Sequence, residues 1–154
     1  MIPFFRKRTL EPDFPPELLT EDGPLGRRGE TLACWFLTCR EHLTLQARNA
    51  VVRLSPTNRR IAGELDLILR DERRGELVFV EVRTRDAVSE RFGTPADSVD
   101  RAKRVRVCHA ARMWMKQNAV PDTQPVRFDV ISIVWPPGCP PELEHWPRAF
   151  GWTK

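Results

Sequence analysis

The stretch from Gly63 to Arg85 reads GELDLILRDERRGELVFVEVRTR, and it decides the fold class of the chain. It contains two apolar runs of strand length, Glu64–Leu69 and Leu77–Arg83, and each run carries at least one acidic residue. Between them lies a polar, glycine-containing segment, Arg70–Gly75, whose composition is typical of a hairpin connection. The sequence therefore predicts two antiparallel strands joined by a short turn.

A turn centred on residues 73–74 would set the register of this predicted hairpin. It would place Asp66 opposite Glu81, and Glu64 opposite Arg83. Side chains that face each other on one sheet surface have Cβ atoms roughly 4.5–5.5 Å apart. Two carboxylates at that separation repel each other unless a cation lies between them, so the spacing predicts a divalent-metal site at Asp66 and Glu81.

The residues alone leave two interpretations of these acids open. In the first, Asp66 or Glu81 forms a partly buried ion pair with Arg83 that serves stability alone. In the second, Glu64, Asp66 and Glu81 gather near Glu30 of a first helix and hold a metal ion. Mg²⁺ is commonly held by one or two carboxylates together with water and substrate phosphate. An acidic cluster in an arginine-rich chain would suit metal-assisted hydrolysis of a phosphodiester.

The composition limits the remaining classes of function. The chain has 154 residues, a net charge of +4 and a pI of about 9.2, and its arginines suit bidentate contacts to phosphate. The four cysteines form no C-x-x-C pair and have no metal-ligand spacing with histidine, so we expect no zinc site. No stretch approaches the ~20 apolar residues of a membrane span, so we expect a cytoplasmic protein without membrane contact.

The sequence predicts three parts: an extended N-terminal tail over residues 1–25, one domain over residues 26–135, and a Pro/Trp-rich C-terminal tail over residues 136–154 that packs on the domain. Apolar periodicity predicts further elements within the domain, namely helices over residues 27–42 and 98–118 and strands over residues 44–54 and 126–135. This order indicates a mixed β-sheet flanked by α-helices, hence an α/β fold.

Several short motifs follow one another in order along residues 26–150. They are Gly26-Arg27-Arg28-Gly29-Glu30, Ala47-Arg48-Asn49, Gly63-Glu64-Leu65-Asp66, Val80-Glu81-Val82-Arg83, Phe92-Gly93, Asp100-x-x-Lys103 and Arg127-Phe128-Asp129-Val130. The ordered set resembles the UPF0102 (YraN-like) family of small bacterial proteins. That family belongs by fold to the restriction-endonuclease-like PD-(D/E)xK nucleases and is similar to Holliday-junction resolvases. The resemblance implies a metal site on the central strands and DNA, branched or damaged, as substrate.

The resemblance also implies roles for individual residues. Asp66 takes the place of the motif's first acid and Glu81 that of its second, with Mg²⁺ or Mn²⁺ as cofactor, and Glu30 matches the acid that many such nucleases carry on the first helix. Arg83 stands where the motif has lysine. An arginine keeps the charge and can contact phosphate, but its very high pKa keeps it protonated and prevents it from acting as a base. Lys103 of the second helix is either a substitute for that lysine or an ordinary solvated residue.

Asp129 lies in a predicted strand and matches the family pattern. It is either a structural acid or a member of the site.

The leading functional prediction is a metal-dependent endonuclease acting on DNA, for which a homodimer would supply two active sites for two strands. The alternative is a catalytically degenerate nucleic-acid-binding module that kept the fold and lost the chemistry at Arg83. A third hypothesis is a protein-interaction subunit that uses the tryptophan-rich tail, with Trp135, Trp146 and Trp152.

Overall fold

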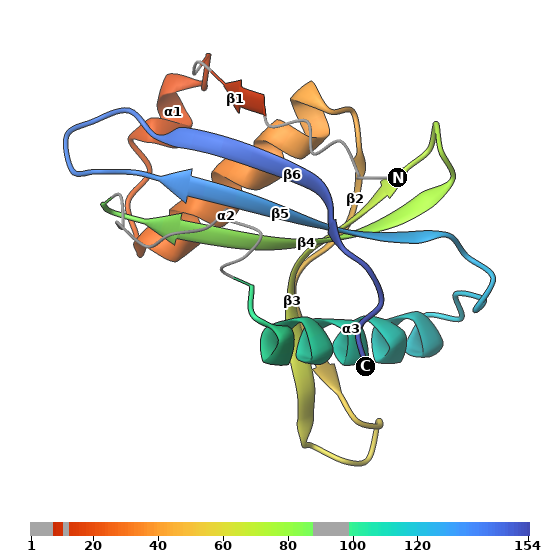
Figure 1. Cartoon of the computed structure of the whole chain (residues 1–154). Coiled ribbons are helices and arrows are strands. Elements are labelled where there is room, and N and C mark those ends of the chain that lie inside the picture. Colours follow the sequence, from red (N-terminus) through yellow and green to blue (C-terminus); the bar gives the residue numbers. More distant parts are fainter. Residues whose placement is uncertain (1–7, 11–12, 88–98) are drawn as a thin grey trace.

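The computed structural model describes residues 8–10, 13–87 and 99–154, which form a six-stranded sheet in the order β1-β6-β5-β4-β3-β2 (Figure 1). β4 and β5 are parallel and the other neighbours are antiparallel, so the sheet is mixed, as predicted. With its flanking helices it is an α/β fold consistent with a restriction-endonuclease-like domain. The motif residues Phe92 and Gly93 lie outside the described residues. The elements are β1 (Arg8–Leu10), α1 (Pro16–Leu19), α2 (Leu25–Trp35), the π-helical turn η1 (Phe36–Arg40), β2 (Thr44–Arg53), β3 (Ile61–Asp71), β4 (Glu76–Arg85), α3 (Arg101–Gln117), β5 (Val126–Val134) and β6 (Glu142–Phe150).

The β3–β4 hairpin has the predicted register. Its paired residues run from Asp71 opposite Glu76 to Leu67 opposite Val80, which centres the turn between residues 73 and 74. The turn ends at Gly75 with φ +64°, a left-handed backbone conformation that glycine adopts without strain.

The two strands of this hairpin separate beyond Leu67 and Val80. β3 continues in antiparallel pairing with β2, whereas β4 continues beside β5, so the strands form a fork near the centre of Figure 1. Glu64 lies opposite Val51 of β2, and the predicted pairing of Glu64 with Arg83 is not formed, because β3 has by then turned away from β4. The fork therefore opens at Asp66, the residue of β3 that follows the last pair, Leu67 with Val80, in the direction away from the turn.

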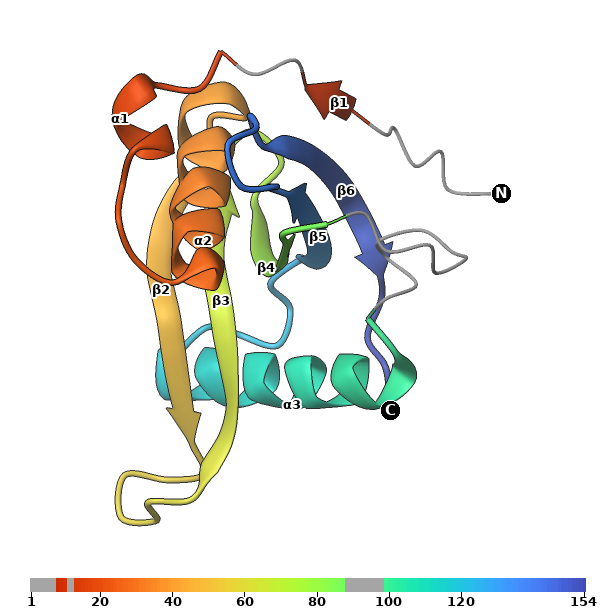
Figure 2. The same cartoon turned by 90° about the vertical axis from the view of Figure 1, so that its left-hand side faces the viewer.

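Helices α2 and α3 cover opposite faces of β4. Successive residues of a strand point to opposite sides, so alternate residues of β4 pack against one helix or the other. Val78 and Val80 join the buried core that contains Leu32 of α2. Phe79 joins the core that contains Ala110 of α3. Figure 2 shows α2 along the upper half of β2 and β3, and α3 crossing below the fork. None of the described helices is long and apolar enough to span a membrane.

Glycine lets both helices approach the sheet closely. A Cβ atom at Gly29 of α2 would overlap the Cβ, hydroxyl and methyl groups of Thr84 in β4. A Cβ atom at Gly63 of β3 would lie 2.9 Å from the Cβ atom of Ala110 in α3. These two contacts fix one helix on each side of the fork.

The predicted first helix, residues 27–42, is divided in the structure into α2 and the π-helical turn η1. The backbone N–H of Glu41 donates to the carbonyl of Phe36 over 3.1 Å, and His42, at φ +58°, ends the helical run. Insertions of π-helical turns into α-helices are frequent near functional sites.

Both segments predicted as tails contribute strands to the sheet. Residues 142–150 form β6, which pairs with β5 on one side and with β1 on the other. Leu143 and His145 alternate as buried residues of β6, but Pro147 and the buried histidine obscure the strand pattern in the sequence. The C-terminal segment is thus built into the sheet.

We expect Gly29→Ala to lower the free energy of unfolding by about 1–3 kcal/mol, because the added methyl group overlaps Thr84. Thr84 is β-branched and its own Cβ is part of the overlap, so a change of rotamer does not relieve it. Gly26→Ala in the same helix is the control, since nothing lies within 4 Å of its added Cβ. Alanine there should leave stability unchanged or raise it by up to about 1 kcal/mol. Urea unfolding measures both variants, and equal effects would contradict the close packing.

Candidate functional site

Asp66 and Glu81 come together where the fork opens. The backbone N–H of Val82 in β4 donates to Oδ2 of Asp66 over 2.9 Å, so a side-chain oxygen takes the place of a strand partner. This hydrogen bond directs the Asp66 carboxylate toward β4, beside Glu81, whose exposed fraction is 6%. The structure thus brings together the two acids that the sequence places opposite each other.

Burial raises the pKa of both acids, and the charge of Asp66 adds to this effect at Glu81. Burial is the main cause for Glu81, followed by the charge of Asp66, and together they raise the Glu81 pKa to about 7. Burial also raises the pKa of Asp66, and the hydrogen bond from Val82, the charges of Lys103 and Arg83 and a hydrogen bond with Glu81 offset this only in part. A cation placed between the two carboxylates would favour the ionised form of each.

Two basic side chains contact the Glu81 carboxylate. Nζ of Lys103 lies 3.1 Å from Oε1 of Glu81, and Nε of Arg83 lies 3.7 Å from the same oxygen. Lys103 is in the first turn of α3, where its backbone N–H donates to the N-cap residue Asp100 over 2.8 Å. The cap fixes the start of α3, so Lys103 reaches the site from the helix and Arg83 from the strand.

Glu30 reaches the neighbourhood of Asp66 from α2. Burial and then the charge of Asp66 raise the Glu30 pKa, while a hydrogen bond with Asn49 and the charges of Arg48 and Arg27 lower it in part. Asn49 lies within β2 at φ +47°, and its neighbours Arg48 and Ala50 pair with the residues that flank Asp66.

Asn49 is a residue of the site neighbourhood to which the sequence reasoning assigned no role. An asparagine inside an otherwise regular strand was the available signal, because asparagine tolerates left-handed backbone better than most residues.

The carboxylates present fit a divalent cation of the magnesium type. Among the described residues, no group of three or more His, Cys, Asp or Glu side chains is arranged to hold a metal ion. Two carboxylates are nevertheless a common protein contribution to a Mg²⁺ site, which water and substrate phosphate complete. The placement of the Asp66 carboxylate beside Glu81 at the fork is the observation that favours a cation here, because a cation would offset the repulsion that Glu81 experiences from Asp66.

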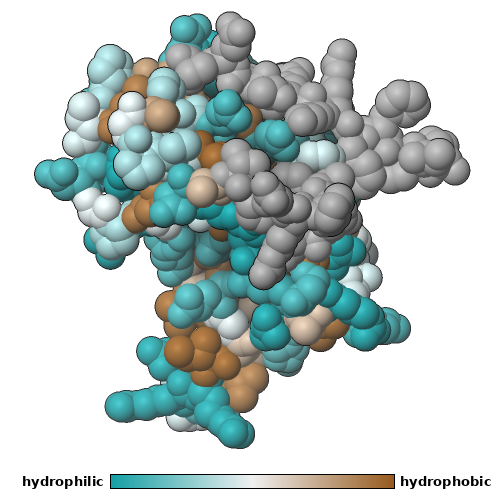
Figure 3. Space-filling model, turned by 60° about the vertical axis from the view of Figure 1, so that its left-hand side comes forward, coloured by the Kyte–Doolittle hydropathy of each residue, from teal (hydrophilic) through white to brown (hydrophobic). Residues whose placement is uncertain are grey.

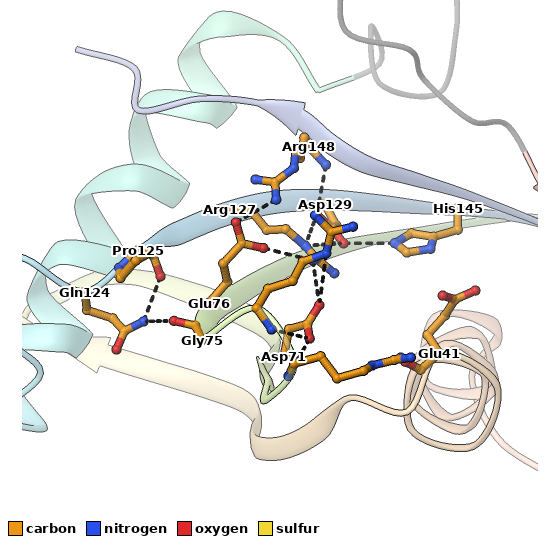
Figure 4. Close-up of polar contacts among 12 residues, drawn as sticks. Glu41, Asp71, Gly75, Glu76, Gln124, Pro125, Arg127, Asp129, His145 and Arg148 are labelled. Carbon is orange, nitrogen blue, oxygen red and sulfur yellow. Dashed lines mark hydrogen bonds and ion pairs between the residues drawn. The ribbon is translucent and has the colours of Figure 1, made fainter.

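Asp129 lies in a second polar cluster, shown in Figure 4, and is not part of the fork. It is fully buried, and Oδ2 is 2.9 Å from Nε2 of His145. Nε of Arg127 donates to both of its oxygens over 3.2 and 3.3 Å, and the backbone N–H of Arg148 donates over 3.0 Å. Asp129 therefore joins β5 to β6 as a structural acid. The sequence reasoning found no role for His145.

The raised pKa of Glu81 predicts a dependence of stability on pH in the absence of divalent cations. The pKa of the Glu81 carboxyl group is about 7 in the folded chain, compared with an ordinary value of 4.5. A group with a pKa raised by folding stabilises the fold fully below pH 4.5, and this contribution is lost as the pH rises through 7. The loss amounts to at most about 3 kcal/mol. Glu81→Gln should remove this slope. Urea unfolding between pH 5 and 8 in EDTA tests it, and equal slopes in both proteins would contradict the assignment.

Comparison with known proteins identifies the family of the chain. The model of the family described as "Uncharacterised protein family UPF0102" matches residues 29–133. A UPF0102 protein of Nocardia farcinica is 39% identical over 127 residues, which cover 82% of this chain and 88% of that protein. One of Clavibacter michiganensis subsp. michiganensis is 38% identical over 127 residues, covering 82% and 95%. One of Rhodopirellula baltica is 36% identical over 147 residues, covering 94% and 81%. The chain therefore belongs to the uncharacterised protein family UPF0102.

Proposed function

We propose that this chain is a metal-dependent endonuclease that hydrolyses phosphodiester bonds in DNA. The observation that carries the proposal is the pair of Asp66 and Glu81 at the fork, with Nζ of Lys103 only 3.1 Å from Glu81. Two acids and a lysine are the chemical groups of the nuclease motif that the sequence resembles. Here the lysine comes from α3 and not from β4.

Asp66 and Glu81 would hold Mg²⁺ or Mn²⁺, with Glu30 adding negative charge from α2. When bound, such an ion supplies an activated water molecule and neutralises charge that develops on the phosphate. The hydrogen bond from Val82 keeps the Asp66 carboxylate in place before substrate arrives. The chain itself thus contributes a preorganised pair of oxygen donors.

Lys103 and Arg83 would each take one of the two roles of the motif lysine, which are to activate the attacking water and to contact the phosphate. Lysine is a compact ammonium group that can exchange a proton, so Lys103 is suited to orient or deprotonate the attacking water. Arginine stays charged and presents a planar fork of donors that matches phosphate, so Arg83 is suited to contact the scissile group.

The hairpin of β2 and β3 supports DNA as the substrate class. It projects past α3 (Figures 1 and 2), and Arg53, Arg59 and Arg60 at its outer end are exposed. Figure 3 shows brown apolar surface beside teal hydrophilic surface on this projecting end, and Val51 and Ile61 are exposed large apolar residues of the hairpin. Arginine beside apolar side chains suits contact with phosphates and bases. β3 connects this surface directly to Asp66. Cleavage of two strands would require two copies of the chain.

A second candidate function is binding of nucleic acid without cleavage. The observation in its favour is that Glu81 already contacts two cationic side chains, Lys103 and Arg83, which compensate part of its charge without a metal ion. A module of this kind would show salt-sensitive DNA binding and no turnover.

Cleavage assays with duplex, flap and four-way-junction DNA in Mg²⁺ or Mn²⁺ separate the two functions. We expect the wild type to cut at least one substrate and Asp66→Asn to abolish cutting while DNA affinity is retained. Lys103→Met should lower the cleavage rate by roughly 100-fold or more if Lys103 handles a proton. Lys116→Met, in the last turn of the same helix, is the control and should cut normally.

The opposite result also has a defined meaning. Salt-sensitive binding without cutting by the wild type, combined with cutting by Arg83→Lys, would establish the degenerate module. Equal cutting by wild type and Asp66→Asn would show that the activity does not arise from this site.

A further inference from the structure

A hollow of about 430 Å³ lies beside the β3–β4 turn, away from the fork. Four arginines line it (Arg73, Arg74, Arg127 and Arg148), together with His145 and two carboxylate residues, Glu41 and Asp71. The charged lining residues carry a net charge of +2, four positive against two negative, with histidine neutral, and two carboxylates outside the lining, Glu76 and Asp129, form ion pairs with Arg127 and Arg148. The hollow is of the size of small-molecule sites, which span roughly 300–1,000 Å³.

The Asp71 carboxylate is engaged within the protein and leaves little negative charge directed at a ligand. Its Oδ1 accepts the backbone N–H groups of Arg73 and Arg74 over 3.1 and 3.2 Å, and its Oδ2 accepts from Nη1 of Arg127 over 3.1 Å. Burial alone would raise the Asp71 pKa, but the Arg74 and Arg127 hydrogen bonds outweigh burial and lower the pKa. Asp71 is therefore a fixed anion that orders the arginines around it.

Arg127 lines the hollow with a side chain that is only 9% exposed and is held by several carboxylates. Its Nε donates to Asp129, and its Nη1 donates to Asp71 and to Glu76. Burial would lower the Arg127 pKa, but the charge of Asp129 and these hydrogen bonds raise it. Nη2 is left without a hydrogen bond within the described residues, so the group can offer donors to a ligand without moving.

Arg74 and Arg148 are the more exposed arginines of the hollow. The Arg74 side chain is 66% exposed and its Nε lies 3.9 Å from Asp71, a loose ion pair. The Arg148 side chain is 48% exposed, and its Nη2 lies 2.6 Å from Glu76. Each guanidinium carries five N–H donors, so these contacts leave most of the donors on both arginines available.

We propose that this hollow binds a phosphate monoester. Four arginines line the hollow, and guanidinium donors match the terminal oxygens of a phosphate dianion through charge-assisted hydrogen bonds, which are about twice as strong as those between neutral groups. The phosphate belongs either to a free nucleotide or to the 5′ end of a DNA strand, and both present the same group. Asp71 and Asp66 are five residues apart on β3, roughly 16 Å along the strand, so the hollow is separate from the fork.

Calorimetric titration of the intact chain with deoxyadenosine 5′-monophosphate tests the proposal, with deoxyadenosine as the ligand control and ionic strength held constant. We expect binding of the monophosphate and none of the nucleoside. Arg74→Gln and Arg148→Gln should each weaken binding at least tenfold, roughly the value of one hydrogen bond to a charged group. Both substitutions leave the contacts of Arg127 with Asp71, Glu76 and Asp129 in place, because neither removes an atom of these four residues.

Two control variants separate this proposal from the proposed function. Arg60→Gln removes an exposed arginine of the β2–β3 hairpin and should leave the affinity unchanged. Asp66→Asn removes the candidate metal ligand and should also leave it unchanged, so a failure of the nuclease proposal does not affect this result. The proposal is overturned by absent binding, or by equal affinity in wild type and the Arg74→Gln/Arg148→Gln double variant.

A second pair of ligands identifies the source of the phosphate. A 5′-phosphorylated oligonucleotide that binds at least tenfold more tightly than its 5′-hydroxyl counterpart, with the difference lost in Arg74→Gln, assigns a strand end. Equal binding of the two oligonucleotides, together with Arg74-dependent binding of the monophosphate, assigns a free nucleotide.

Discussion

Repulsion between two carboxylates held side by side in a largely buried position is the constraint around which this molecule is arranged. Asp66 and Glu81 each have a raised pKa, with burial as the main cause for both and the charge of Asp66 as a second cause for Glu81. The fold compensates this charge from several directions, with the Val82 N–H from β4, Lys103 from α3 and Arg83 from the end of the strand. Compensation is incomplete, and the remaining negative charge is what a divalent cation would neutralise.

The fork between β3 and β4 explains how a regular sheet can hold such a pair. Within a continuous ladder both strands would use their backbone groups on each other, and no side-chain oxygen could accept from a backbone N–H. The strands separate after Leu67 and Val80, so the Val82 N–H becomes available to Asp66. Close packing at Gly29 and Gly63 then holds a helix on each side of the opening. The same glycines that tighten the core thereby fix the surroundings of the acids.

The local sequence pattern was sufficient to predict the register of the β3–β4 hairpin, because the turn residues and the strand lengths leave few alternatives. This register in turn places Asp66 beside Glu81. Features that depend on distant segments could not be predicted in this way. The hydrogen bond of Asn49 with Glu30 joins β2 to α2, and Asn49 has a positive φ inside a strand. The contact of Asp129 with His145 joins β5 to β6, a strand whose alternation is masked by proline. The resemblance to a family supplied the roles of the site residues, which spacing alone did not.

Calorimetric titration of the intact chain with Mn²⁺ at pH 8 tests the central claim most directly, because that pH lies above the Glu81 pKa of about 7. We expect saturable binding by the wild type, loss of binding in Asp66→Asn, and full retention in Glu64→Gln, which alters an exposed acid of the same strand. Absence of binding by the wild type, or equal binding by wild type and Asp66→Asn, would contradict a metal site at the fork.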